Sequence, residues 1–171
     1  MKRTWMYLFL ASVMILAPGC PPGGGLYDDG NNNSNDNNDN GNGGPGVEVT
    51  FSAAFSGDQE APPVVSNGTG SGTFTLNAAG TELSFDITAS GLSGPVTLAH
   101  FHSGPPGVAG GIVFHITDTI VEDAEGNITA TGVWPIDDAN VTALLAGNIY
   151  VNLHTANHAT GEIRGQLIEV E

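Results

Sequence analysis

Basic residues are almost absent from this sequence. Lys and Arg total 3 in 171 residues against 18 Asp and Glu, which gives a formal net charge of −15 at pH 7. Lys2 and Arg3 stand at the N-terminus, so Arg164 is the single Lys or Arg after residue 20. Proteins bind phosphate backbones through clusters of Lys and Arg, so this charge balance excludes nucleic acid as a partner.

Cysteine and the familiar catalytic motifs are also missing. Cys20 is the only cysteine, so the chain can form neither an internal disulfide nor a thiolate zinc site. The sequence has no G-x-S-x-G nucleophile motif, no P-loop, and no G-x-G-x-x-G segment between a strand and a helix. Charged residues make up only 12% and apolar residues 40%, which argues against a wholly disordered acidic chain.

The N-terminus is typical of a secretory signal. Lys2 and Arg3 precede an apolar run from Trp5 to Leu16, which is shorter than the roughly 20 residues of a spanning helix. Residues 17–20, Ala-Pro-Gly-Cys, end the segment. The segment resembles a bacterial lipoprotein signal, with Ala-Pro where that signal usually has Leu and a small residue. The resemblance implies a signal over residues 1–19, lipidation of Cys20 and attachment to a membrane. Ordinary signal-peptidase cleavage and a retained anchor helix are the alternatives.

A tether over residues 20–46 separates this signal from the rest of the chain. Between Pro21 and Gly46 nearly every residue is Pro, Gly, Asn, Asp or Ser, which cannot bury enough apolar surface to offset the entropy of ordering. Residues 36–41 match the first half of a calcium loop, but the residue that should close the loop is Val47. We therefore expect a disordered spacer rather than a calcium site.

Residues 47–171 have the pattern of an all-β domain. Short β-rich runs with period-two alternation are separated by Gly, Pro, Asn and Asp. One short helix is expected over Asp137–Ala146, capped by Asp137 or Asp138 and ended by Gly147. We predict an antiparallel Greek-key β-sandwich or barrel of about eight strands. The expected strands are Val47–Phe55, Gly70–Leu76, Glu82–Ala89, Thr97–His102, Ile112–Thr117, Ile128–Trp134, Ile149–Thr155 and Gly161–Val170.

Histidines are the main candidates for chemistry. His100 and His102 form a His-x-His pair on one expected strand, so both rings lie on one face, and His154 alternates in the same way on a later strand. Three imidazoles on neighbouring strands suit copper or zinc. Alternatively, the rings form hydrogen bonds that brace the loop 103–111. His115 and His158 are further candidates that the sequence does not place.

Arg164 is the second notable residue. It shares a strand face with Glu162 and Gln166, and we expect it to form a structural ion pair with Glu60 or Glu162. An anion-binding role is the alternative, and it is disfavoured because the surrounding acids repel an anionic ligand.

Four segments resemble the CHRD (chordin) family, in that family's order. They are Gly57–Val64 (GDQEAPPV), Ala99–Gly104 (AHFHSG), Leu145–Thr155 (LAGNIYVNLHT) and Gly161–Leu167 (GEIRGQL). The resemblance, to the bacterial secreted or lipoprotein type, implies an extracytoplasmic β-sandwich module over residues 47–171 and leaves its ligand open. His158 stands where the family pattern has Pro.

Two functional hypotheses follow. The first is a non-enzymatic, lipid-anchored binding module outside the cytoplasm or at the cell surface, with an unknown protein, glycan or metal ligand. The second is a copper- or zinc-binding redox protein, because His-x-His with a later His on a Greek-key barrel is similar to the copper side of Cu/Zn superoxide dismutase. The dismutase's zinc loop and disulfide have no counterpart in the sequence.

Overall fold

A computed structural model of the protein describes residues 45–171. The expected signal over residues 1–19, Cys20, the half calcium motif and nearly all of the expected tether lie outside the described residues. None of the helices within residues 45–171 has the length and apolar character needed to cross a membrane.

The domain has ten strands, one α-helix and two short 3-10 helices. The strands are β1 Val49–Ser56, β2 Thr69–Leu76, β3 Glu82–Ser90, β4 Val96–Ser103, β5 Gly111–His115, β6 Ile120–Glu122, β7 Ile128–Pro135, β8 Ile149–Thr155, β9 Ile163–Gln166 and β10 Ile168–Glu169. The helices are η1 Gly57–Gln59, η2 Thr117–Thr119 and α1 Asp138–Leu145. Each of the eight expected strands is present, and the last of them divides into β9 and β10 at Leu167.

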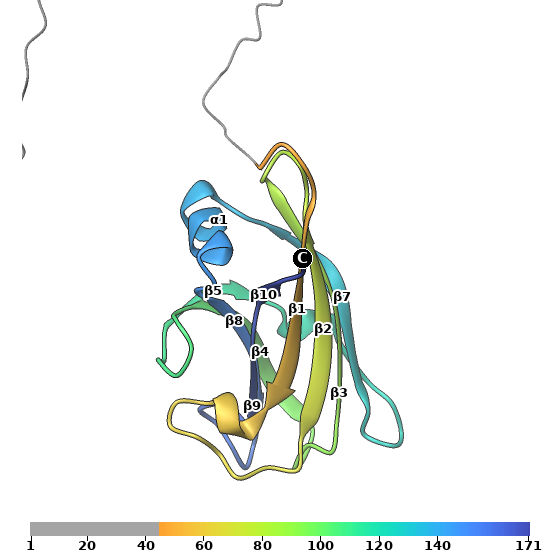
Figure 1. The fold of residues 1–171 in the computed structure, drawn as a ribbon. Coiled ribbons are helices and arrows are strands. Elements are labelled where there is room, and N and C mark those ends of the chain that lie inside the picture. The colour runs from red at the N-terminus through yellow and green to blue at the C-terminus, as the bar shows by residue number, and fades with distance from the viewer. Residues whose placement is uncertain (1–44) are drawn as a thin grey trace, which may run out of the picture. The chain divides into compact units, whose positions relative to one another are not determined.

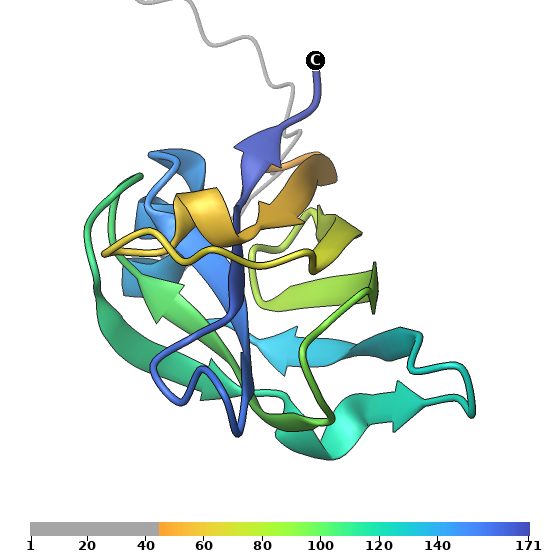
Figure 2. The same cartoon turned by 90° about the horizontal axis from the view of Figure 1, so that it is seen from below.

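The strands pair antiparallel in one continuous sheet. Their order is β5-β4-β8-β9-β1-β2-β3-β7-β6, with β10 pairing to β1 beside β9. The sheet curls into a half-barrel, so that β1, β2, β3 and β7 lie across from β4, β5 and β8 (Figures 1 and 2). The predicted all-β antiparallel class is confirmed.

The apolar core fills the concave side of this sheet. Strand β3 alternates strictly between buried and exposed residues, with Leu83, Phe85 and Ile87 turned inward. Phe101 of β4 reaches the same core from the facing side, with its ring edge-on to Phe85 at a centroid distance of 5.5 Å. Fully burying an aliphatic or phenyl side chain contributes about 1.5–3 kcal/mol, so this alternation fixes which face of each strand turns inward.

The strands β8 and β9, and residues 99–102 of β4, differ from the other strands because both of their faces are buried. Every residue of β8 and β9 is buried, including the polar residues on the face turned away from the core. The connecting segments that follow β1, β4 and β8 cover this second face and bond to it. We call its buried polar residues the polar layer: Glu60, His100, His102, Asn152, His154, Arg164 and Gln166.

Helix α1 forms where the sequence predicts it. Asp137 caps its first turn, with its carboxylate accepting a hydrogen bond from Asn140 N at 2.8 Å. Gly147 adopts a φ of 71° after the last turn, a conformation that favours glycine. The chain then enters β8 and carries His154 into the polar layer.

Candidate metal centre

Strand pairing places the three histidines on one face of the sheet. His100 and His102 belong to β4, and β8 lies directly beside β4 in antiparallel register. In that register His100 lies opposite Asn152, and Leu98 lies opposite His154. The side chains of His100, His102 and His154 therefore project from adjacent strands into the same space.

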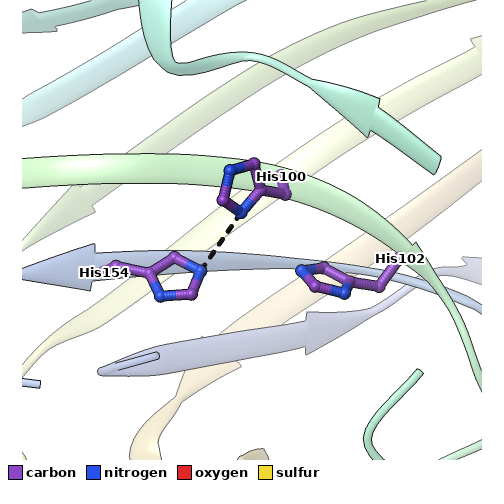
Figure 3. A group of neighbouring side chains, drawn as sticks. All are labelled: His100, His102 and His154. Carbon is purple, nitrogen blue, oxygen red and sulfur yellow. Dashed lines mark hydrogen bonds between the residues drawn. The ribbon is translucent and has the colours of Figure 1, made fainter. Parts of the chain in front are cut away.

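The structure brings the three rings together. One potential ligand atom from each ring lies within 4.8 Å of those of the other two. His100 Nδ1 and His154 Nε2 are 3.3 Å apart, and all three rings are turned toward one another (Figure 3). The side chains of His100, His102 and His154 are only 3%, 8% and 7% exposed. Whether a metal binds there stays a prediction.

Backbone carbonyls fix the tautomers of two of these rings. His102 Nδ1 lies 3.0 Å from Gly110 O, and His154 Nδ1 lies 3.1 Å from Ala159 O. Because a carbonyl oxygen only accepts, each Nδ1 carries the hydrogen and each Nε2 of the neutral ring presents a lone pair. His102 Nε2 is buried and has no hydrogen-bond partner among the described residues. Metal-binding histidines are commonly held in this way, with the second ring nitrogen donating to a carbonyl.

The site also favours neutral imidazoles. Burial and, after it, the neighbouring histidines lower the pKa of His100 from 6.5 to about 4. Burial is the largest cause that lowers the pKa of His102 and of His154. Near neutral pH the three rings therefore keep the lone pairs that metal coordination requires.

Asn152 is a fourth polar member that sequence reasoning did not include. Its Oδ1 lies 3.0 Å from His154 Nε2, so the unprotonated nitrogen faces another acceptor. Burial has the larger effect on the pKa of Glu60 and raises it, whereas Asn152 lowers it. The signal was its position two residues before His154, which puts both on one strand face.

This cluster lies within the region that matches a known family. The model of the CHRD domain matches residues 51–167, which is more than half of the chain. The chain belongs to the CHRD family. A search of curated proteins found no significant match.

Arg164 ties a loop of the CHRD domain to the sheet. It is 1% exposed and donates through Nη1 to Val108 O and through Nη2 to Pro105 O, both at 2.9 Å. Nη2 also donates to Gln166 Oε1 at 2.8 Å, and the guanidinium carbon lies 3.4 Å from the centroid of the Tyr150 ring. Its hydrogen-bond partners are thus neutral oxygens, where the sequence suggested carboxylates.

The two acids expected to pair with Arg164 have separate surroundings. Glu162 is fully buried and accepts hydrogen bonds from Ser66, Ser93 and Thr155. Glu60 has one buried oxygen without a partner; burial raises its pKa, and the charge of Arg164 acts in the opposite direction. Glu60 therefore interacts with Arg164 through its charge, whereas Glu162 joins loops through hydroxyl groups.

Of the two histidines that the sequence did not place, His115 lies against the cluster and His158 lies in a loop. His115 of β5 pairs directly with His100, and their rings are 4.8 Å apart between centroids. His158 lies in the segment after β8, where its backbone nitrogen donates to Thr155 O at 3.1 Å. His115 therefore contacts the cluster from the edge strand.

Proposed function

We propose that this CHRD protein is an extracytoplasmic binding module that holds a transition-metal ion through His100, His102 and His154. Membership of the CHRD family suggests a non-enzymatic binding module. The observation that carries the proposal for metal is the pair of carbonyls, of Gly110 and Ala159, that bond to Nδ1 of His102 and His154 and leave each Nε2 lone pair available to join His100 as a ligand within a cluster of 4.8 Å.

The donor set favours copper or zinc. Imidazole nitrogen binds zinc, copper, nickel and iron, whereas calcium and magnesium prefer oxygen ligands. Three nitrogens leave a fourth coordination position, and Asn152 Oδ1, 3.0 Å from His154 Nε2, is the candidate ligand for it. The surrounding polar layer supplies the outer hydrogen bonds that orient metal-binding histidines.

Metal binding is tested by calorimetric titration of the full chain with Zn²⁺ and with Cu²⁺. His102→Gln should abolish or strongly weaken binding, because it removes the Nε2 ligand while keeping a donor for Gly110 O. The matched control is His158→Gln, which changes a histidine outside the cluster and should bind like the wild type. A wild-type chain that binds neither ion would refute the proposal and leave the three rings a structural role.

The same samples distinguish the redox hypothesis from the non-enzymatic binding module. Copper-loaded protein that accelerates superoxide dismutation, and loses this activity in His102→Gln, would place the protein among redox enzymes. Binding without turnover would support the module.

We further propose that Cys20 is lipidated and that residues 20–46 hold the domain away from a membrane. Support comes from the basic and apolar signal before Cys20 and from the polar composition after it. A flexible chain of that length spans roughly 25–30 Å. Cys20→Ser should leave the detergent phase in a partitioning assay or accumulate unprocessed. Unchanged partitioning of this variant would contradict the lipid anchor.

A further inference from the structure

His115 is a solvent-exposed histidine in direct contact with a buried one. It lies on β5, the edge strand of the sheet, opposite His100 of β4. The two rings meet edge to face, with centroids 4.8 Å apart and an interplanar angle of 86°. His115 is exposed, whereas His100 is only 3% exposed. One imidazole therefore faces the solvent, and the next belongs to the cluster.

The other two rings of the cluster contact buried residues and backbone carbonyls rather than an exposed imidazole. Gly110 O bonds to His102, and Ala159 O bonds to His154, so the segments that contain Gly110 and Ala159 lie against these two rings. His102 also stacks on Tyr150, with ring centroids 4.8 Å apart and planes within 5°. Among the three histidines, His100 is the one with an aromatic contact to an exposed ring in the described part of the chain.

We propose that His115 captures the metal ion from solvent and passes it to His100, without belonging to the final ligand set. This inference rests on the proposed metal-binding function. The final ligands are the three rings whose nitrogens lie within 4.8 Å of one another, a group to which His115 does not belong.

The physical reason is the hydration of the ion. An aqueous Cu²⁺ or Zn²⁺ ion must exchange its water molecules for imidazole nitrogens before it reaches a buried site. A first exchange with an exposed imidazole takes place while the other waters remain, so the ion is not stripped in one step. The net charge of −15 draws cations toward the protein in general, but it does not select a point of access.

This role predicts a specific kinetic signature. A residue that contacts the ion only in transit lowers the barrier equally in both directions. Its removal should therefore slow association and dissociation by the same factor and leave the Kd unchanged. A final ligand behaves differently, because its removal weakens the Kd mainly by speeding dissociation.

The test is stopped-flow mixing of the full chain with Cu²⁺, followed by quenching of tryptophan fluorescence, with a chelator chase for dissociation. In His115→Ala we expect both rates to fall about tenfold, equivalent to about 1.4 kcal/mol in the barrier, with the Kd within about twofold of wild type. His115→Asp, which restores an exposed metal-binding group, should recover most of the rate. His158→Ala is the matched control and should match wild type.

Each alternative outcome is decisive. Unchanged rates in His115→Ala overturn the inference and leave the metal site standing. A weaker Kd with normal association also overturns it and makes His115 a ligand. A slow His115→Asp variant would assign the effect to packing at the sheet edge and overturn it as well. If the wild-type protein binds no copper, the proposed metal-binding function is refuted, and the proposed role of His115 is refuted with it.

Discussion

Replacing Arg164 by alanine tests how the polar layer holds its covering loop. The guanidinium is 1% exposed and donates three hydrogen bonds, to Val108 O, Pro105 O and Gln166 Oε1. It also packs over the ring of Tyr150. Alanine removes all four contacts and leaves the loop without its charged anchor.

The expected cost follows from the groups left behind. Gln166 Oε1, which is buried, and Val108 O, which is part-buried, lose their donor, whereas Pro105 O still accepts a hydrogen bond from Val108 N at 3.2 Å. An unsatisfied buried acceptor costs about 1–3 kcal/mol, and the guanidinium also leaves its packing over Tyr150. Water entering the vacated space will restore part of this, so we expect a net loss of about 3–5 kcal/mol, similar to the cost of breaking a buried charged pair. At roughly 3–5 °C per kcal/mol for a domain of this size, the Tm should fall by about 10–20 °C.

The assay is thermal and urea unfolding of the full chain, followed by circular dichroism. Arg164→Lys keeps the charge but lacks the planar fork that reaches several acceptors, so its stability should lie between alanine and wild type. Thr131→Ala, an exposed change on β7, is the control and should stay within about 0.5 kcal/mol. An Arg164→Ala variant as stable as this control would show that the guanidinium does not anchor the loop.

Two further predictions concern the loops beside the site. Burial raises the pKa of Glu162, but hydrogen bonds from Ser93, Thr155 and Ser66 outweigh it and leave the pKa below 4.5. This carboxylate therefore stabilises the fold above about pH 4.5 and loses that effect as the pH falls through its folded pKa, so the stability gap between wild type and Glu162→Gln should narrow in acid. A gap that is constant with pH in urea titrations would contradict this. Gly161 has a φ of +125°, and a Cβ there would overlap Glu60 Oε1, so Gly161→Ala should cost about 1–3 kcal/mol. Gly94→Ala, where a Cβ meets nothing within 4 Å, is the control, and equal unfolding midpoints for the two variants would refute the argument.

The strands were predictable because their side chains alternate. Leu83, Phe85 and Ile87 alternate with polar residues in β3, and this pattern identifies a strand with one buried face. β6 was missed because three residues, Ile120–Glu122, are too few to show a period. The division of the last expected strand was also hidden, since it depends on a change of partner, from β8 for β9 to β1 for β10.

The candidate site was predictable only where it depends on alternation within a single strand. His-x-His spacing placed His100 and His102 on one face, and alternation in β8 placed His154 on the matching face. The position of His115 depends on the pairing of β4 with β5, which spacing does not reveal. The hydrogen-bond partners of Arg164 depend on how the loop after β4 folds over the sheet. The sequence predicted Glu60 or Glu162 as partners, but in the folded domain Arg164 donates to the backbone carbonyls of Val108 and Pro105.

The two buried faces of β8, β9 and residues 99–102 of β4 imply an order of folding. The apolar face needs only the strands, because hydrophobic contact has little directional requirement. The polar layer needs its loops already in position, since hydrogen bonds such as Gly110 N to Tyr150 Oη act only at close range and good angles. The loops should therefore close after the sheet has formed. Their amides should exchange with deuterium through local opening, whereas the amides of β8 should exchange only through global unfolding. A domain built in this way can release and recover its loops while its sheet stays intact.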